Sequence, residues 1–584
     1  MRNFLKMFLA AFLALVIFTV VSFFFFVVWI TALASSEKEE VGSKAVLVID
    51  LAVPFPEKMQ ENPLAAFGVK NQYDIPGLYD VIRMVNKAGR DSGVKGILIK
   101  ANTNNSGFAA SEELRNAIED FKGTGKFVYA YGDMISQKAY YISSVADKIY
   151  LNPKGALDWR GFALQMVFLK GTLEKLEIEP QIFYAGKFKS ATEPFREKKM
   201  TEPNRVQTSE IMNDLYTHFL QNISKARQID TASLRRFADE NLLQFAADAV
   251  KYKMVDGLKY EDELREELRV KLKMDMNDNI NLVPIEKYAK AVNFRSSGKD
   301  RIAVIYAQGD IVYGKGEDGQ IGSATYANLI RKARMDKNVK AIVLRINSGG
   351  GSSLASENIW REMTLARKEK PVVVSFGDVA ASGAYYLACN ADSIFAQPNT
   401  ITGSIGVFAM IPNMQKFFNN KLGMTFDGVK TGPHADALTV TEPLSPAQRV
   451  FIQNEVDTIY HDFKSRVAEG RKMDLAFVDS IGQGRIWSGE RAIGLNLVDR
   501  IGGMQDALDC AARMAKIKEY RLKEYPESEG FFDKMFGGYT QTYKSKVMKE
   551  ELGEDGIKLF QTIRRVKSMM GSTQARMPYE FSVE

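Results

Sequence analysis

The sequence predicts an α/β protein of two tandem repeats with mostly parallel sheets and helical extensions, preceded by one transmembrane helix. Several blocks of sequence recur at a single spacing, which predicts the repeats. Short apolar runs alternate with helical patterns, which predicts parallel sheets. A long uncharged segment close to the N-terminus predicts the membrane span.

The recurring blocks indicate an internal duplication. "VKGILIKAN" (Val94 to Asn102) returns as "VKAIVLRIN" (Val339 to Asn347), 245 residues later. The same offset relates "ASEEL" to "ASENI", "YGDMISQKAYYIS" to "FGDVAASGAYYLA", and "ADKIYLNPK" to "ADSIFAQPN". Agreement at one offset over so many blocks is typical of a duplicated domain.

Each copy has the sequence pattern that is typical of a buried parallel sheet. Apolar runs such as "GILIK" and "KFVYAY" in the first copy, and "AIVLRI" and "PVVVSF" in the second, predict strands buried on both faces. Helical patterns such as "SEELRNAIEDFK" separate them. Strands that alternate with helices predict right-handed crossovers and a largely parallel sheet.

These patterns divide the chain into five expected segments. A cytoplasmic stub and a transmembrane anchor come first, then a repeat, a polar linker, a second repeat and a tail with an amphipathic helix candidate. Their expected ranges are, in that order, 1–40, 44–275, 276–300, 301–525 and 526–584.

The N-terminal segment predicts a membrane anchor. No charged residue occurs from Met7 to Ala34, which is long enough for a helix to span a bilayer. Arg2 and Lys6 precede the segment and glutamates follow it, so the positive-inside rule places the body outside the cytoplasm. A cleaved signal peptide is the alternative, because "ALA" at 32–34 resembles a cleavage site.

Composition excludes several classes of function. The net charge of +7 is small for 584 residues and gives no reason to expect nucleic-acid binding. Two cysteines and three scattered histidines do not predict a disulfide framework or a metal site. We therefore expect neither a metal nor a cofactor.

Differences between the two copies locate the predicted chemistry. Gln137 of the first copy aligns with Ser382 of the second, and the glycine run "NSGGGS" occurs only in the second. In the other direction, Lys189 of the first copy aligns with Ala435 of the second. Because each copy lacks what the other has, we expect Ser382 and Lys189 to form one site across the two repeats, a serine–lysine dyad.

Other interpretations of these residues remain open. Ser382 precedes an apolar run and is suited to cap a helix, and Lys187 rivals Lys189 as the base. His434 with Asp436 offers a histidine-dependent hydrolase instead. A duplicated domain can also be a non-catalytic membrane scaffold.

The motifs "NSGGGS", "AASGAYYLA", "ITGSIGVF" and "GKFKSATEP" resemble the signal peptide peptidase A (protease IV) family in its long bacterial form. The resemblance implies a crotonase-like fold, related to Clp protease subunits, in each repeat. It implies a homotetrameric serine protease that degrades released signal peptides and other apolar peptides at the periplasmic side of the inner membrane.

By position in these motifs, Ser382 resembles the family's nucleophile and Lys189 its general base. Ser404 resembles a serine that orients the lysine, and it aligns with Trp159 of the first copy. Candidate oxyanion donors are the backbone N–H groups of Gly350 or Gly351, with that of Gly383. The family commonly has proline where this chain has Gly349.

Overall fold

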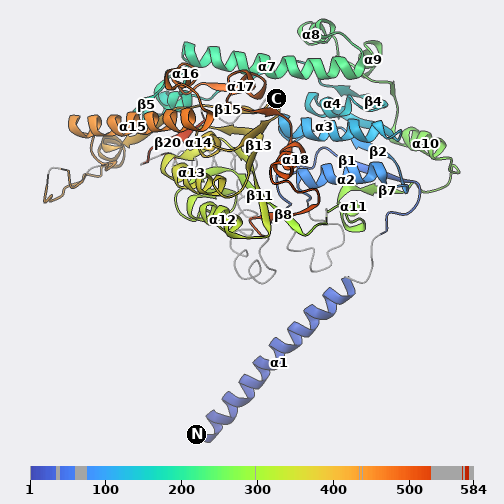
Figure 1. Ribbon diagram of the computed structural model, residues 1–584, viewed down its shortest axis with the longest axis horizontal. Coiled ribbons are helices and arrows are strands. Elements are labelled where there is room, and N and C mark those ends of the chain that lie inside the picture. Colours follow the sequence, from blue (N-terminus) through green and yellow to red (C-terminus); the bar gives the residue numbers. More distant parts are fainter. Residues whose placement is uncertain are drawn as a thin grey trace.

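The computed structural model describes residues 2–34, 40–59, 75–295, 297–432, 434–436, 438–527, 569 and 572–577. Helix α1 (Arg2–Ala34) stands apart from the globular body (Figure 1). Its segment Asn3–Ser22 has a mean hydropathy of 2.6 and is not buried. Its length and composition are those of a helix that can cross a membrane.

The first repeat contains a sheet of six strands that all run parallel. The strand order is β6-β4-β3-β2-β1-β7. The strands are β1 (Ala45–Asp50), β2 (Val94–Lys100), β3 (Phe127–Ile135), β4 (Lys148–Leu157), β6 (Gly257–Leu258) and β7 (Leu282–Pro284). Strand β7 lies inside the segment 276–300 that the sequence predicts as a linker, and it pairs with β1 at the sheet edge.

The second repeat contains an equivalent sheet of eight strands. The order β18-β14-β13-β11-β8-β19 repeats that of the first sheet, and all these pairs are parallel. Strand β15 adds parallel to β13, and β17 adds antiparallel to β15. The strands are β8 (Asp300–Gln308), β11 (Val339–Ser348), β13 (Val372–Ala381), β14 (Ser393–Ala396), β15 (Ile401–Gly403), β17 (Ile486–Ser488), β18 (Arg500–Ile501) and β19 (Tyr520–Tyr525).

The helices follow the same duplication. The first repeat has α2 (Leu78–Arg90), α3 (Phe108–Gly123), α4 (Gln137–Ser143), α5 (Lys170–Leu176), α6 (Glu193–Arg196), α7 (Glu202–Arg227), α8 (Thr231–Asp239), α9 (Ala246–Lys251), α10 (Glu261–Leu272) and α11 (Ile285–Ala291). The second has α12 (Ser323–Met335), α13 (Ser353–Arg367), α14 (Gly383–Ala388), α15 (Pro446–Arg471), α16 (Leu475–Ile481), α17 (Gly489–Gly494) and α18 (Met504–Met514). Short helices lie at Ser190–Thr192 and Phe417–Leu422.

Helices α2, α3 and strands β2, β3 begin 245 residues before α12, α13, β11 and β13. The spacing of the sequence repeats therefore extends to the folded elements, and the predicted α/β architecture of two repeats with mostly parallel sheets is confirmed. Each repeat has its own large apolar core. Strands that are buried on both faces need helices on both sides of the sheet, and side chains of both kinds of element make up each core.

A third sheet is built from both repeats and the tail. Its order is β10-β9-β12-β20-β16-β5. The strands are β5 (Glu179–Ala185), β9 (Asp310–Val312), β10 (Gln320–Gly322), β12 (Gly350–Ser352), β16 (Val407–Asn413) and β20 (Gln574–Arg576). Strand β5 comes from the first repeat and pairs antiparallel with β16 of the second along its whole length. The first repeat thus extends an arm into the second (Figure 1).

Buried charges also join the two repeats. The Arg345 guanidinium on β11 donates to Glu57 Oε2 at 2.8 Å and to Glu113 Oε1 at 2.6 Å, and both carboxylates belong to the first repeat. Asp378 on β13 accepts hydrogen bonds from the backbone N–H groups of Ala109 and Ala110 in the first turn of α3. These contacts fix the relative position of the repeats, which any site across them requires.

Candidate active site

Ser382 lies in a sharp turn between strand β13 and helix α14. Its φ of 56° and ψ of −117° are unfavourable for a residue with a Cβ, and such strain concentrates at functional sites. The Ser382 N–H donates to Gly403 O at 2.8 Å, and Tyr386 N–H donates to Ser382 O at 2.8 Å. The turn is therefore held from both sides, and the side chain is fully buried.

Lys189 reaches Ser382 from the first repeat. The β5 arm leads directly to Lys189, whose Nζ lies 2.7 Å from Ser382 Oγ. Lys189 Nζ also lies 3.0 Å from Ser404 Oγ and 3.1 Å from Ser404 O. The structure therefore brings Ser382, Lys189 and Ser404 together within one chain.

The amine of Lys189 is buried among neutral groups. Its side chain is 1% exposed, and among the described residues no carboxylate lies within ion-pairing distance of it. Burial penalises the ammonium form, so the pKa of Lys189 lies well below its usual value. A neutral amine has one lone pair for the Ser382 hydroxyl and two N–H groups for the two Ser404 oxygens.

Ser404 is fixed by its own strained backbone. Its φ is 53°, and its N–H donates to Arg485 O at 2.6 Å. Ser404 is fully buried, immediately after strand β15. The residue can accept from the Lys189 amine through both its carbonyl and its hydroxyl, which orients the amine toward Ser382.

The three candidate oxyanion glycines gather beside Ser382. The Gly350 N–H donates to Ser348 Oγ at 3.1 Å, whereas Gly383 begins helix α14 directly after Ser382. A Cβ on Gly350 would lie 2.7 Å from Gly383 N, and a Cβ on Gly383 would lie 3.3 Å from Gly351 N. The backbone N–H groups of Gly351 and Gly383 are thus close enough to bind one oxygen together.

The alternative residues lie elsewhere. Lys187 is exposed and its Nζ lies over the Phe188 ring, 5.1 Å from the centroid. His434 is exposed in a surface turn, and Asp436 forms an ion pair with Lys430. Among the described residues, Ser382 Oγ has its side-chain hydrogen bond with Lys189 and none with a histidine.

Gln137, which replaces the serine in the first repeat, has a structural role there. Its side chain accepts from the N–H groups of Arg160 and Gly161 and donates to Gly161 O. The equivalent turn of the first repeat is therefore filled by a self-contained hydrogen-bond network.

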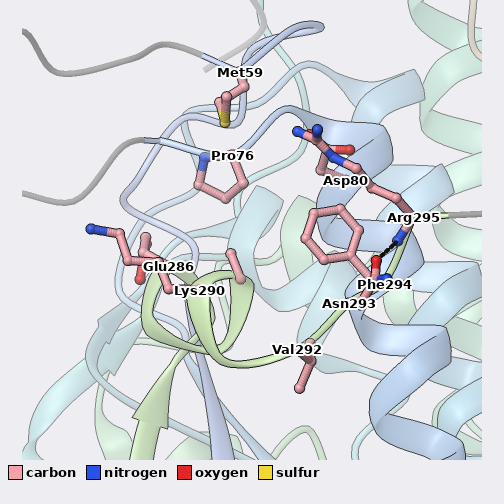
Figure 2. A pocket seen from close by; sticks show the side chains of 10 residues that line it. Met59, Pro76, Asp80, Glu286, Lys290, Val292, Asn293, Phe294 and Arg295 are labelled. Atoms are coloured by element: carbon pink, nitrogen blue, oxygen red, sulfur yellow. Dashed lines mark hydrogen bonds between the residues drawn. The ribbon is translucent and has the colours of Figure 1, made fainter. Parts of the chain in front are cut away.

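A cavity of about 260 Å³ is lined by residues other than these groups. Figure 2 shows its lining side chains, which come from Met59 and Pro76 before α2, from the start of α2, from α11 and from the segment after α11. The described residues that line it include no serine, cysteine or histidine. This lining contains no hydroxyl or thiol side chain, so the buried Ser382–Lys189 pair remains the candidate active site.

Sequence reasoning missed the residues that hold Lys189 in place. Gln207 Nε2 on α7 donates to Phe188 O at 3.0 Å and to Ser190 Oγ at 2.9 Å, on either side of the lysine. Gly484 of the second repeat packs against the Lys189 backbone. The two glycines of the "GQGR" segment indicate a place where another backbone can approach closely. Nothing in the sequence indicates that the approaching backbone is that of Lys189.

Gly484→Ala is expected to displace Lys189 and lower kcat/KM of a reaction at Ser382 by about 10- to 100-fold, because small misplacements of a reacting group are costly. A Cβ at Gly484 would lie 2.6 Å from Lys189 N, and the φ of 76° disfavours alanine. Gly494→Ala is the matched control, since no atom lies within 4 Å of its Cβ position. Equal kcat/KM values for the two variants would contradict this role of Gly484.

Comparison with known proteins identifies the family of this chain. The model of peptidase family S49 matches residues 120–275 and 364–518, one match in each repeat. "Protease 4" of Salmonella typhi is 33% identical over 529 residues, which cover 88% of this chain and 85% of that protein. "Serine protease SPPA, chloroplastic" of Arabidopsis thaliana is 32% identical and covers 74% of this chain and 64% of that protein.

The S49 matches cover both copies, and the similarity to the Salmonella protein extends over most of both chains. The chain therefore belongs to peptidase family S49, as a serine protease made of two S49 repeats.

Proposed function

We propose that this chain is a membrane-anchored serine endopeptidase in which Ser382 is the nucleophile and Lys189 the general base. The distance of 2.7 Å between Lys189 Nζ and Ser382 Oγ, in a buried site where the described residues place no carboxylate beside the amine, carries this proposal. A lysine accepts a proton only in its neutral form, and burial favours that form.

Acylation begins with the Ser382 hydroxyl. Lys189 accepts its proton while Ser382 Oγ attacks the carbonyl carbon of the scissile peptide bond. Negative charge develops on the carbonyl oxygen, and we assign its stabilisation to the N–H groups of Gly351 and Gly383, whose backbones lie close together. Ser404 holds the lysine amine in line with the hydroxyl throughout.

Collapse of the tetrahedral intermediate breaks the C–N bond. The Lys189 ammonium gives its proton to the leaving amine, which departs as the new N-terminus. Lys189, neutral again, takes a proton from a water molecule that attacks the acyl-enzyme. The ammonium then returns that proton to Ser382 Oγ, and the acid product leaves.

The N-terminal helix, long and apolar enough to cross a membrane, favours apolar peptides at a membrane as substrates. We propose released signal peptides as the substrate class and the periplasmic face of the inner membrane as the place of action, since the charges around α1 orient the body outward. We propose crotonase-like repeats that assemble as a homotetramer. We propose that the dyad closes within one chain, because Lys189 Nζ and Ser382 Oγ of the same chain lie 2.7 Å apart.

Labelling with a serine-directed fluorophosphonate tests this function. The full chain is expected to gain one adduct, located on Ser382 by peptide mass spectrometry, because only an activated serine reacts. Ser480→Ala removes an exposed serine and serves as the control, in which labelling should persist. Labelling that survives in Ser382→Ala, or an adduct at another serine, would overturn the proposal.

A further inference from the structure

Strand β20, from the C-terminal part of the chain, lies beside the turn that carries Ser382. It is antiparallel to β12 on one side and to β16 on the other. Met577 N–H donates to Gly349 O at 2.6 Å, and Ser353 N–H donates to Thr573 O at 3.2 Å. Such two-sided pairing is how an extended peptide is bound by strand addition.

The carbonyl of Ala575 lies at the candidate oxyanion site. The register of β12 and β20 places Ala575 opposite Gly351. A Cβ on Gly350 would lie 2.2 Å from Ala575 O, and a Cβ on Gly383 would lie 2.9 Å from the same oxygen. The bond that β20 presents to Ser382 is therefore the one between Ala575 and Arg576.

The side chain after that bond has a charged partner. Arg576 Nη2 lies 2.7 Å from Asp310 Oδ2 on β9, with 2% and 38% of the two side chains exposed. Asp310 belongs to the second repeat, two strands away from β20 in the same sheet. A carboxylate thus lies where a substrate residue just after the scissile bond would place its side chain.

We propose that Asp310 forms a subsite that selects an arginine or lysine immediately on the carboxyl side of the scissile bond. The proposal rests on the proposed function, because it takes Ser382 as the nucleophile. The β20 segment shows how such a peptide lies: an alanine carbonyl at Gly351 and Gly383, and a basic side chain against Asp310. A charge-assisted hydrogen bond from a buried guanidinium is stronger than a neutral one.

The reaction at such a peptide balances without a further reactant. Ser382 Oγ bonds to the alanine carbonyl carbon, and its proton goes to Lys189. The bond from that carbon to the nitrogen of the basic residue breaks, and Lys189 protonates this nitrogen. Water then hydrolyses the ester and restores Ser382.

Quenched fluorescent peptides Thr-Gln-Ala-X-Met, with X as Arg, Lys, Gln or Glu, test the subsite on the full chain. The ratio of kcat/KM for X = Arg over X = Gln is expected to be about 10. Asp310→Asn should bring the ratio close to 1, and Asp310→Lys should favour X = Glu. High salt should lower the ratio, since Asp310 is partly exposed.

Two controls separate selection from other effects. Asp318→Asn, an exposed change after β9, should keep the ratio. Arg576→Gln should also keep it, because the basic side chain that Asp310 binds in this assay belongs to the peptide and not to β20. A ratio near 1 in the unaltered chain, or one that persists in Asp310→Asn, overturns the subsite. Cleavage of the X = Gln peptide that disappears in Ser382→Ala supports the proposed function independently of the ratio.

Discussion

Ser382→Ala is expected to lower kcat/KM for peptide hydrolysis by at least about 10⁴-fold, because the proposed acyl-enzyme forms on this hydroxyl. The fold should persist, since alanine keeps the N–H and carbonyl that bond to Gly403 and Tyr386. Steady-state hydrolysis of a fluorogenic peptide, with the melting temperature of the same preparation, measures both effects.

Thr402→Val is the matched control for that change. Thr402 is a fully buried residue of the neighbouring strand β15, and its hydroxyl donates to Ala380 O at 2.7 Å. Loss of this hydroxyl should change kcat/KM by no more than about threefold, because it touches no reacting group. A Ser382→Ala chain that keeps a tenth of the activity would remove Ser382 from the role of nucleophile.

Lys189→Met is expected to abolish hydrolysis to a similar extent while making the fold more stable near neutral pH. The pKa of Lys189 is depressed in the folded chain by burial. Between that pKa and the ordinary lysine value of about 10.4, the unfolded chain binds the extra proton, so the lysine lowers the free energy of unfolding. The advantage of methionine should be largest at or below neutral pH and should disappear as pH rises toward about 10.4.

Chemical denaturation at several pH values measures that advantage. Lys187→Met is the control, because Lys187 is exposed and its replacement should leave kcat/KM unchanged. Lys189→Arg should be as inactive as Lys189→Met, since arginine stays protonated. A Lys189→Met chain that is less stable than the parent at pH 7 would contradict a neutral buried amine.

The duplication makes the larger part of the fold predictable. Strands that are buried on both faces have apolar sequences, and the recurrence at 245 residues indicates from the sequence alone that β2 and β3 correspond to β11 and β13. The same comparison separates Ser382 from Gln137, because a residue that is required in only one copy differs between the copies. The segment 276–300 is predicted less well: it is polar, yet β7 pairs at the edge of the first sheet.

The repeat comparison predicts the contact between Ser382 and Lys189, whereas other contacts between distant segments leave no pattern in the sequence. Asp310 on β9 contacts Arg576 two strands away in the same sheet, and Gly484, in the turn before β17, lies against the Lys189 backbone. No spacing in the sequence links either residue to its partner. The amphipathic helix expected in the tail falls on residues that lie almost entirely outside the described part of the chain. The sequence does not predict the described strand β20 at all, because three residues carry too little periodicity to indicate a strand.

The protonation state of Lys189 tests the whole account most directly. NMR of the full chain in detergent, with lysine labelled with ¹³C at Cε, measures the protonation state of each lysine. The signal that is missing from the spectrum of Lys189→Met is assigned to Lys189. The account predicts that this signal titrates well below the other lysines and that kcat/KM rises over the same pH range. A signal that titrates with the surface lysines would show an ammonium beside Ser382 at neutral pH, and Lys189 could not then be the base.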